Sequence, residues 1–175
     1  MSTTLFLVTV VIITALFFDF TNGFHDSANA MATSVATGAL KPKVAVLMIG
    51  TNNSNGNEYS AEQIGDGIVA IVQKLRAKLP ETKILILAVF PRGENPNSQR
   101  EKNAAASARG AKLADNKHVF FLDIGEKFLD EKGHLAKEIM PDYLHLSPKG
   151  YQIWAESIEP KLAELLGDKP VAGHE

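Results

Sequence analysis

The chain has 175 residues, enough for one domain to bury a hydrophobic core without disulfides or a structural metal. Because it contains no cysteine, a disulfide scaffold, a thiol nucleophile and a cysteine-ligated zinc site are excluded. Its formal net charge of -2 does not provide the basic surface on which nucleic acid binds, so we expect no nucleic-acid partner.

The first part of the chain differs from the rest in charge. Residues 1–40 contain no lysine or arginine, and all 18 basic residues follow them. Residues 5–18 read LFLVTVVIITALFF, an apolar run shorter than the roughly 18 to 20 residues that span a bilayer. This run is consistent with a buried strand, a signal-like segment or a shortened membrane helix, although a secretory signal would begin with a basic residue. Membrane contact through residues 5–18 stays open, as does the choice between a cytoplasmic and a membrane-associated location.

From residue 43 onwards, predicted strands and helices alternate. Residues 43–50, KVAVLMIG, are a short apolar run that predicts a strand buried on both faces of a parallel sheet. A helix is predicted over 60–80, where Ser60 and Gln63 form a capping box. Residues 83–91, KILILAVFP, predict a second buried strand.

Three further elements complete the pattern. A helix is predicted over 98–115 and a third strand over 118–124. A closing helix follows, with Ser147 as its cap and Pro148 in its first turn, and Pro160 is predicted to kink or split it. Buried strands alternating with helices are typical of a doubly wound α/β fold, here with a mainly parallel sheet of three to four strands.

Two loops carry side chains suited to acyl chemistry at the carboxyl ends of the strands, where sites form in such sheets. Residues 50–57, GTNNSNGN, follow the first strand, and the Asn52 amide can donate a hydrogen bond to a developing oxyanion. An asparagine-rich loop is also common as an ordinary turn. In MPDYLHLSPKGY, Asp142 lies three residues before His145 and can accept from its Nδ1–H, which leaves Nε2 to take a proton. A surface turn before a helix cap is the alternative.

Other polar residues give weaker indications. Arg92 and Arg100 flank the sequence GENPNSQ, and they either line the substrate side of the sheet or belong to a solvated loop. The remaining four histidines show no metal-ligand spacing, so no metal site is expected.

Three segments, VAVLMIGTNN, ILILAVFPRGENPNSQREKN and MPDYLHLSPKGY, resemble successive motifs of the SGNH (GDSL-type) esterase family. Within that family they are most similar to the catalytic subunits of platelet-activating-factor acetylhydrolase. The resemblance covers residues 43–166 and leaves 167–175 as a tail. It implies a flavodoxin-like fold, with Asn52 in the oxyanion hole, Asp142 as the triad acid and His145 as the general base. It further implies hydrolysis of small acyl esters through a serine acyl-enzyme, with no metal or cofactor, and leaves a homodimer open.

The chain departs from this family at its amino end, where the Gly-Asp-Ser nucleophile motif is expected before Gly50. Residues 1–42 instead contain NGFHDSANAMATSVATGALKP, which resembles the first repeat of the inorganic phosphate transporter (PiT) family. Ser27 is the candidate nucleophile here, because an Asp-Ser pair follows an apolar run, but it lies only 25 residues before Asn52, too few for the elements that should intervene. A fusion of a transporter-like amino end to an incomplete esterase domain is the interpretation that the sequence favours.

The sequence thus predicts an ester hydrolase of the SGNH type acting on small acyl esters, incomplete at its amino end and with an appended apolar segment. The alternative is a non-catalytic module, either a pseudo-esterase or a membrane-tethered fragment of a phosphate transporter fusion. Residues 5–18 then either bind a membrane or pack as a substitute strand on the sheet.

Overall fold

The computed structural model describes residues 43–169, which lie within one compact unit of the chain. Three parallel strands form its sheet in the order β1 (Val44–Leu47), β2 (Lys83–Leu87) and β3 (Val119–Leu122). Val46 of β1 lies opposite Leu85 of β2, which in turn lies opposite Phe120 of β3. Within the described residues, β2 is therefore the central strand.

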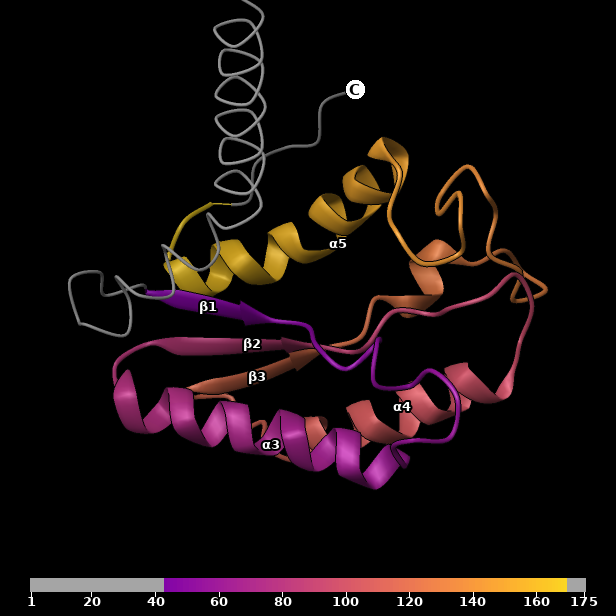
Figure 1. The fold of residues 1–175 in the computed structure, drawn as a ribbon. Helices are drawn as coiled ribbons and strands as arrows, with labels where there is room; N and C mark the ends of the chain where they lie inside the picture. Colours follow the sequence, from indigo (N-terminus) through magenta and orange to yellow (C-terminus); the bar gives the residue numbers. More distant parts are fainter. Residues whose placement is uncertain (1–42, 170–175) are drawn as a thin grey trace, which may run out of the picture. The chain divides into compact units, whose positions relative to one another are not determined.

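Helices cover both faces of this sheet (Figure 1). The crossovers contain α3 (Ala61–Lys78), between β1 and β2, and α4 (Ser98–Ala111), between β2 and β3. Both helices lie on the same face. A 3-10 helix, η1 (Gly125–Phe128), follows β3 and leads to α5 (Pro148–Leu166), which lies on the opposite face (Figure 1).

Alternating side chains of β2 build the two halves of the core. Leu85 and Leu87 belong to a buried cluster that includes Leu165 of α5, and Ile84 and Ile86 belong to a second cluster with side chains of α3. Successive residues of a strand point to opposite faces, so one short apolar run supplies both clusters. Each buried aliphatic side chain contributes on the order of 1.5 to 3 kcal/mol to folding.

The predicted helix starts are confirmed. Ser60 and Gln63 form the expected capping box at the start of α3, and Ser147 caps α5 with Pro148 in its first turn. The predicted split at Pro160 is wrong, because α5 continues to Leu166. Ala163 and Leu165, beyond the proline, are buried, and this packing holds the last turns in the helix.

The predicted burial of the first strand is also wrong. Within the described residues β1 pairs with β2 alone, and Val46 keeps 42% of its surface exposed. An apolar run does not reveal whether a strand has one neighbour or two, and the side chains of a strand with one neighbour are covered less completely.

Parallel strands with helices on both faces agree with the predicted α/β class. The strand order runs in one direction, so the reversal that defines a doubly wound sheet is not seen within residues 43–169. No helix in this part of the chain is long and apolar enough to cross a bilayer. The predictions for residues 1–42, including the apolar segment 5–18, lie outside the described residues.

Candidate active site

The Asp142–His145 pair is the centre of the candidate site. His145 Nδ1 lies 2.6 Å from Asp142 Oδ2, so the predicted hydrogen bond is confirmed. Asp142 Oδ1 also accepts from the backbone N–H groups of His145 at 2.7 Å and Leu144 at 3.0 Å. Both carboxylate oxygens thus hold one turn closed, and a ring that donates through Nδ1 presents Nε2 as a proton acceptor.

This pair is open to solvent. The His145 side chain is 78% exposed and that of Asp142 is 55% exposed. The hydrogen bond from the His145 ring, followed by the backbone N–H groups of His145 and Leu144, lowers the pKa of the Asp142 carboxyl far below its ordinary value. Asp142 is therefore ionised at neutral pH and orients the imidazole without competing for its proton.

Asn52 lies on the loop that follows β1, where Gly50 makes the chain turn. Gly50 has a φ of +115°, and a Cβ at this position would lie 2.8 Å from Cγ2 of Ile64. Only glycine combines this backbone angle with so close an approach. Asn52 is exposed, and its side-chain amide makes no hydrogen bond to another described residue. The amide can therefore bind an incoming oxygen atom.

Buried contacts stabilise this loop. Ser54 is buried, donates to Thr51 O at 2.7 Å and accepts from Gln99 Nε2 at 3.0 Å. Gln99 also donates to Asn55 Oδ1 at 2.9 Å, which ties the loop to the first turn of α4. Sequence reasoning missed Ser54 and Gln99, because the pairing of two polar residues 45 positions apart leaves no local signal.

Arg92 and Gly93 connect the Asn52 loop to the His145 turn. Arg92 Nη1 donates to Thr51 O at 3.0 Å and to Asn55 Oδ1 at 2.9 Å. Gly93 N donates to Tyr143 O at 3.2 Å. The Arg92 side chain is thus half-buried and bound to the Asn52 loop, which differs from the solvated-loop alternative.

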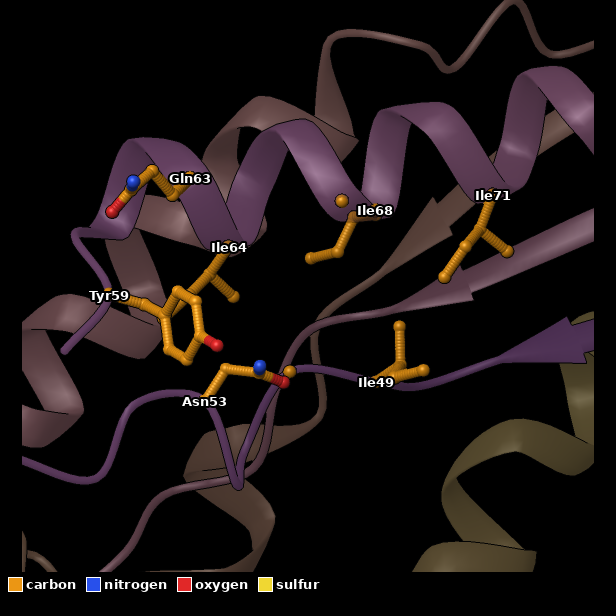
Figure 2. Close-up of a pocket in the computed structure, with 9 residues that line it drawn as sticks. Ile49, Asn53, Tyr59, Gln63, Ile64, Ile68 and Ile71 are labelled. Atoms are coloured by element: carbon orange, nitrogen blue, oxygen red, sulfur yellow. The ribbon is translucent and has the colours of Figure 1, made fainter.

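Depressions in the surface adjoin these loops. Isoleucines of α3 line an apolar groove of about 170 Å3 together with Ile49 and Asn53 (Figure 2). A second depression, of about 570 Å3, is lined by Glu94, His134 and Tyr143, among others. Tyr143 directly follows Asp142, so this second depression borders the histidine turn.

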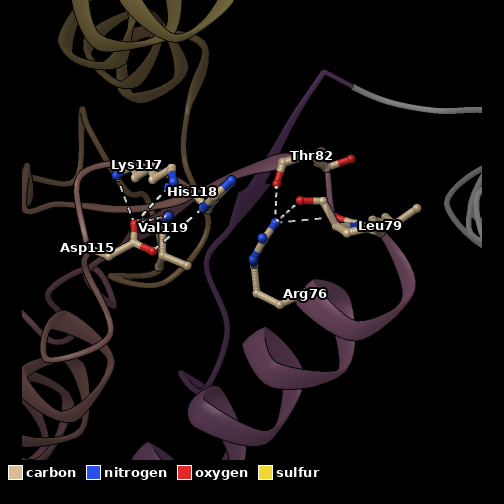
Figure 3. Close-up of polar contacts among 8 residues, drawn as sticks. Arg76, Leu79, Thr82, Asp115, Lys117, His118 and Val119 are labelled. Carbon is tan, nitrogen blue, oxygen red and sulfur yellow. Dashed lines mark hydrogen bonds and ion pairs between the residues drawn. The ribbon is translucent and has the colours of Figure 1, made fainter.

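Two other Asp–His turns were not singled out from the sequence. Asp115 repeats the Asp-x-x-His spacing, but its Oδ2 is 3.9 Å from His118 Nδ1, and its Oδ1 accepts from three backbone N–H groups at the start of β3 (Figure 3). Asp130 Oδ2 is 3.5 Å from His134 Nδ1. Spacing alone therefore does not distinguish a catalytic pair from a turn. Ser27, the candidate nucleophile, lies outside the described residues.

Comparisons with known proteins agree with the motif order. A family model described as the GDSL-like lipase/acylhydrolase family matches residues 20–153. The platelet-activating factor acetylhydrolase IB subunit alpha2 of Rattus norvegicus is 37% identical over 132 residues, which cover 75% of this chain and 56% of that protein. The alpha1 subunit of Homo sapiens is 37% identical over 128 residues, covering 73% of this chain and 54% of that protein.

Solved structures show the same fold. A carbohydrate acetylesterase from Sinorhizobium meliloti matches with a TM-score of 0.56 and 22% identity, covering 76% of this chain and 67% of that one. At this identity the likeness concerns the fold alone.

These comparisons also bear on the amino end. The chain spans about half the length of the curated relatives that it matches. The resemblance of residues 1–42 to phosphate transporters is not shown by the comparisons, and the family match enters this segment at residue 20. Since that match extends over most of the sequence and includes the Asn52 loop and the His145 turn, the chain belongs to the GDSL-like lipase/acylhydrolase family.

Proposed function

We propose that this chain takes part in hydrolysis of small acyl esters, with His145 as general base, Asp142 as its orienting acid and Asn52 as an oxyanion donor. The observation that carries this proposal is the 2.6 Å hydrogen bond between Asp142 and the Nδ1 side of His145. Membership of an acylhydrolase family and similarity to acetylhydrolase subunits support the substrate class.

The proposed reaction has two halves. A serine Oγ attacks the ester carbonyl while His145 Nε2 takes the hydroxyl proton, and Asn52 donates to the oxyanion of the tetrahedral intermediate. Collapse of the intermediate breaks the C–O bond, and the alcohol leaves with the proton from His145. Water then attacks the acyl-enzyme by the same route, which releases the acid and regenerates the serine.

A non-catalytic role is the second candidate, and one observation favours it. Within residues 43–169, no hydroxyl group is hydrogen-bonded to Nε2 of His145. Ser27, which lies within the family match and outside the described residues, is the candidate nucleophile for an active enzyme.

Turnover of p-nitrophenyl acetate tests the proposal. We expect hydrolysis above the buffer rate that disappears in His145→Ala and in Ser27→Ala, and that falls roughly 10²- to 10³-fold in Asn52→Ala. His118→Ala is the matched control for unspecific catalysis by a second solvent-accessible imidazole and should keep the wild-type rate.

A fluorophosphonate label followed by peptide mass spectrometry identifies the nucleophile independently of the rate. Labelling at Ser27 that requires His145 would support the serine mechanism. A chain that neither labels nor hydrolyses the ester would instead be the non-catalytic module.

A further inference from the structure

We propose that Arg100 is a positioning residue that holds the Asn52 loop and the His145 turn in a fixed relation to each other. The inference rests on the proposed function for the chemical role of the two loops. The contacts that carry it are geometric and do not depend on that role.

Arg100 binds three consecutive backbone carbonyls. Its Nε donates to Arg92 O at 2.9 Å, and its Nη2 donates to Gly93 O at 2.6 Å and Glu94 O at 3.1 Å. Its Nη1 donates to Gly133 O at 2.6 Å. All three nitrogens of the guanidinium are thus used on main-chain oxygen atoms.

Two residues of this segment, Arg92 and Gly93, each form hydrogen bonds to a loop of the candidate site. Arg92 donates to Thr51 O and Asn55 Oδ1, on either side of Asn52. Gly93 N–H donates to Tyr143 O, and Glu94 lines the same depression as Tyr143. The segment held by Arg100 is therefore the bridge between the two loops.

This bridge has no regular secondary structure of its own. Gly93 adopts a φ of +75°, and Tyr143 adopts +59°, a left-handed conformation that is costly for a residue with a side chain. Three carbonyl oxygens that converge on one point repel each other unless a cation lies between them. A planar guanidinium meets several acceptors at once, whereas a lysine ammonium is a single point charge on a flexible stem.

The anchor of Arg100 is rigid. The residue lies in the first turn of α4, and its backbone N–H donates to Oδ1 of the helix cap Asn97 at 3.0 Å. The Asn97 amide in turn donates to Arg92 O at 2.8 Å. A side chain that extends from a capped helix places the bridge more reproducibly than loop contacts alone, as the positioning of a site requires.

The test is Arg100→Lys, with Arg76→Lys as the matched control. Arg76 also donates from its guanidinium to backbone carbonyls, those of Leu79, Pro80 and Thr82 (Figure 3). These carbonyls lie just before β2, at the amino ends of the strands, whereas the candidate site lies at their carboxyl ends. Both variants keep the positive charge but replace the planar guanidinium with a single ammonium group. They therefore separate a general loss of stability from a displacement of the site.

NMR spectra of the folded proteins at neutral pH provide the readout. In Arg100→Lys we expect amide shifts at residues 51–55 and 142–146, together with changed ring nitrogen shifts of His145. Arg76→Lys should leave both loops and the ring unchanged. Where the wild type hydrolyses p-nitrophenyl acetate, Arg100→Lys should lower kcat roughly 10- to 100-fold with little change in KM, because a displaced base aligns poorly with its reactants.

Shifts confined to residues 92–97 and 133 in Arg100→Lys would overturn the inference, as would equal effects of the two variants. Should Arg100→Lys fail to fold, amide hydrogen exchange of the wild type provides the test. The Gly93 amide is bonded to Tyr143 O, and the Leu135 amide to Glu94 O. We expect both amides to exchange in a single opening step together with the amide of His145. Independent opening would contradict the proposal. A wild type that lacks turnover overturns the proposed function alone, since the NMR result stands without it.

Discussion

At the scale of single residues, three Asp–His turns within the described residues differ in how the ring is held. Only His145 has its Nδ1 within hydrogen-bonding distance of a carboxylate oxygen at 2.6 Å, against 3.5 Å for His134 and 3.9 Å for His118. Asp115 instead uses its Oδ1 on three backbone N–H groups. Each aspartate therefore closes its own turn through backbone N–H groups, and Asp142 is the one of the three that also holds the ring closely.

Asp142→Asn should remove the acceptor that orients the His145 ring. We expect any ester turnover to fall roughly 10²- to 10⁴-fold, because an asparagine amide can donate to Nδ1 and thereby favour the wrong tautomer. Ring nitrogen shifts of His145 should change in parallel. Asp130→Asn is the control, because that carboxylate lies farther from its histidine, and it should change neither quantity. Equal rates in the two variants would contradict the role of Asp142.

A second prediction concerns Asp115 and acid stability. The backbone N–H groups of Val119, His118 and Lys117 lower the pKa of this carboxyl far below its ordinary value of 3.8. A carboxyl whose pKa is lower in the folded state stabilises the fold above its unfolded pKa and loses that contribution as the pH falls through the folded pKa. The urea midpoint should therefore decline below about pH 4. Asp115→Asn should flatten this decline, and an unchanged pH dependence would count against it.

At the scale of elements, glycines set the close approach of α3 and α4. A Cβ on Gly65 would lie 2.9 Å from Cβ of Arg109, and one on Gly110 would lie 3.0 Å from Cγ2 of Ile68. Arg109 also forms an ion pair with Asp66 across the same contact. In the sequence GDG of α3, Gly65 is therefore a packing position, whereas Gly67 faces open space.

Gly65→Ala and Gly67→Ala should therefore change stability in opposite directions. A Cβ on Gly67 meets no atom within 4 Å, so alanine should stabilise the helix by about 0.5 to 1 kcal/mol. At Gly65 the added methyl group must displace Arg109, and this cost exceeds the gain in helix propensity. We therefore expect the free energy of unfolding to fall by about 1 to 3 kcal/mol. Urea unfolding of both variants measures the difference. Stabilisation by both alanines would show that the helices separate without cost.

At the scale of the whole molecule, the two outer strands of the described sheet, β1 and β3, differ in how far their side chains are buried. Val119 of β3 is buried and belongs to the core cluster beneath α3, whereas Val46 of β1 is 42% exposed. The apolar groove beside Ile49 lies on this same exposed side (Figure 2). The candidate site thus has one loop on the least covered strand of the described sheet.

Valine-to-alanine substitutions in the two strands test this difference in burial. Val119→Ala should lower the free energy of unfolding by about 2 kcal/mol, because two buried methyl groups leave a cavity. Val46→Ala should lower it by less than about 1 kcal/mol, because water already reaches much of that side chain. Urea unfolding at neutral pH gives both values. A large loss in Val46→Ala would show that β1 is covered in solution.

The sequence by itself determined the elements and the identity of the candidate pair. Helix caps such as Ser60 and Ser147, and apolar runs such as 83–91, are local signals, since their hydrogen bonds and periodicity involve neighbours along the chain. The spacing of Asp142 and His145 made their hydrogen bond possible, but Asp115 and His118 share that spacing and lie 3.9 Å apart, so the spacing did not fix the contact.

Only the tertiary structure decided which local patterns meet. The exposure of β1 depends on its pairing with β2 alone among the described residues, and the roles of Arg92 and Arg100 depend on carbonyls up to 41 positions away. Asp115 and Asp142 share a spacing and both close a turn of the backbone, yet Asp142 alone of the two also binds its histidine ring within 3 Å. Such differences arise from packing between distant segments, and an amino-acid pattern carries no local record of those contacts.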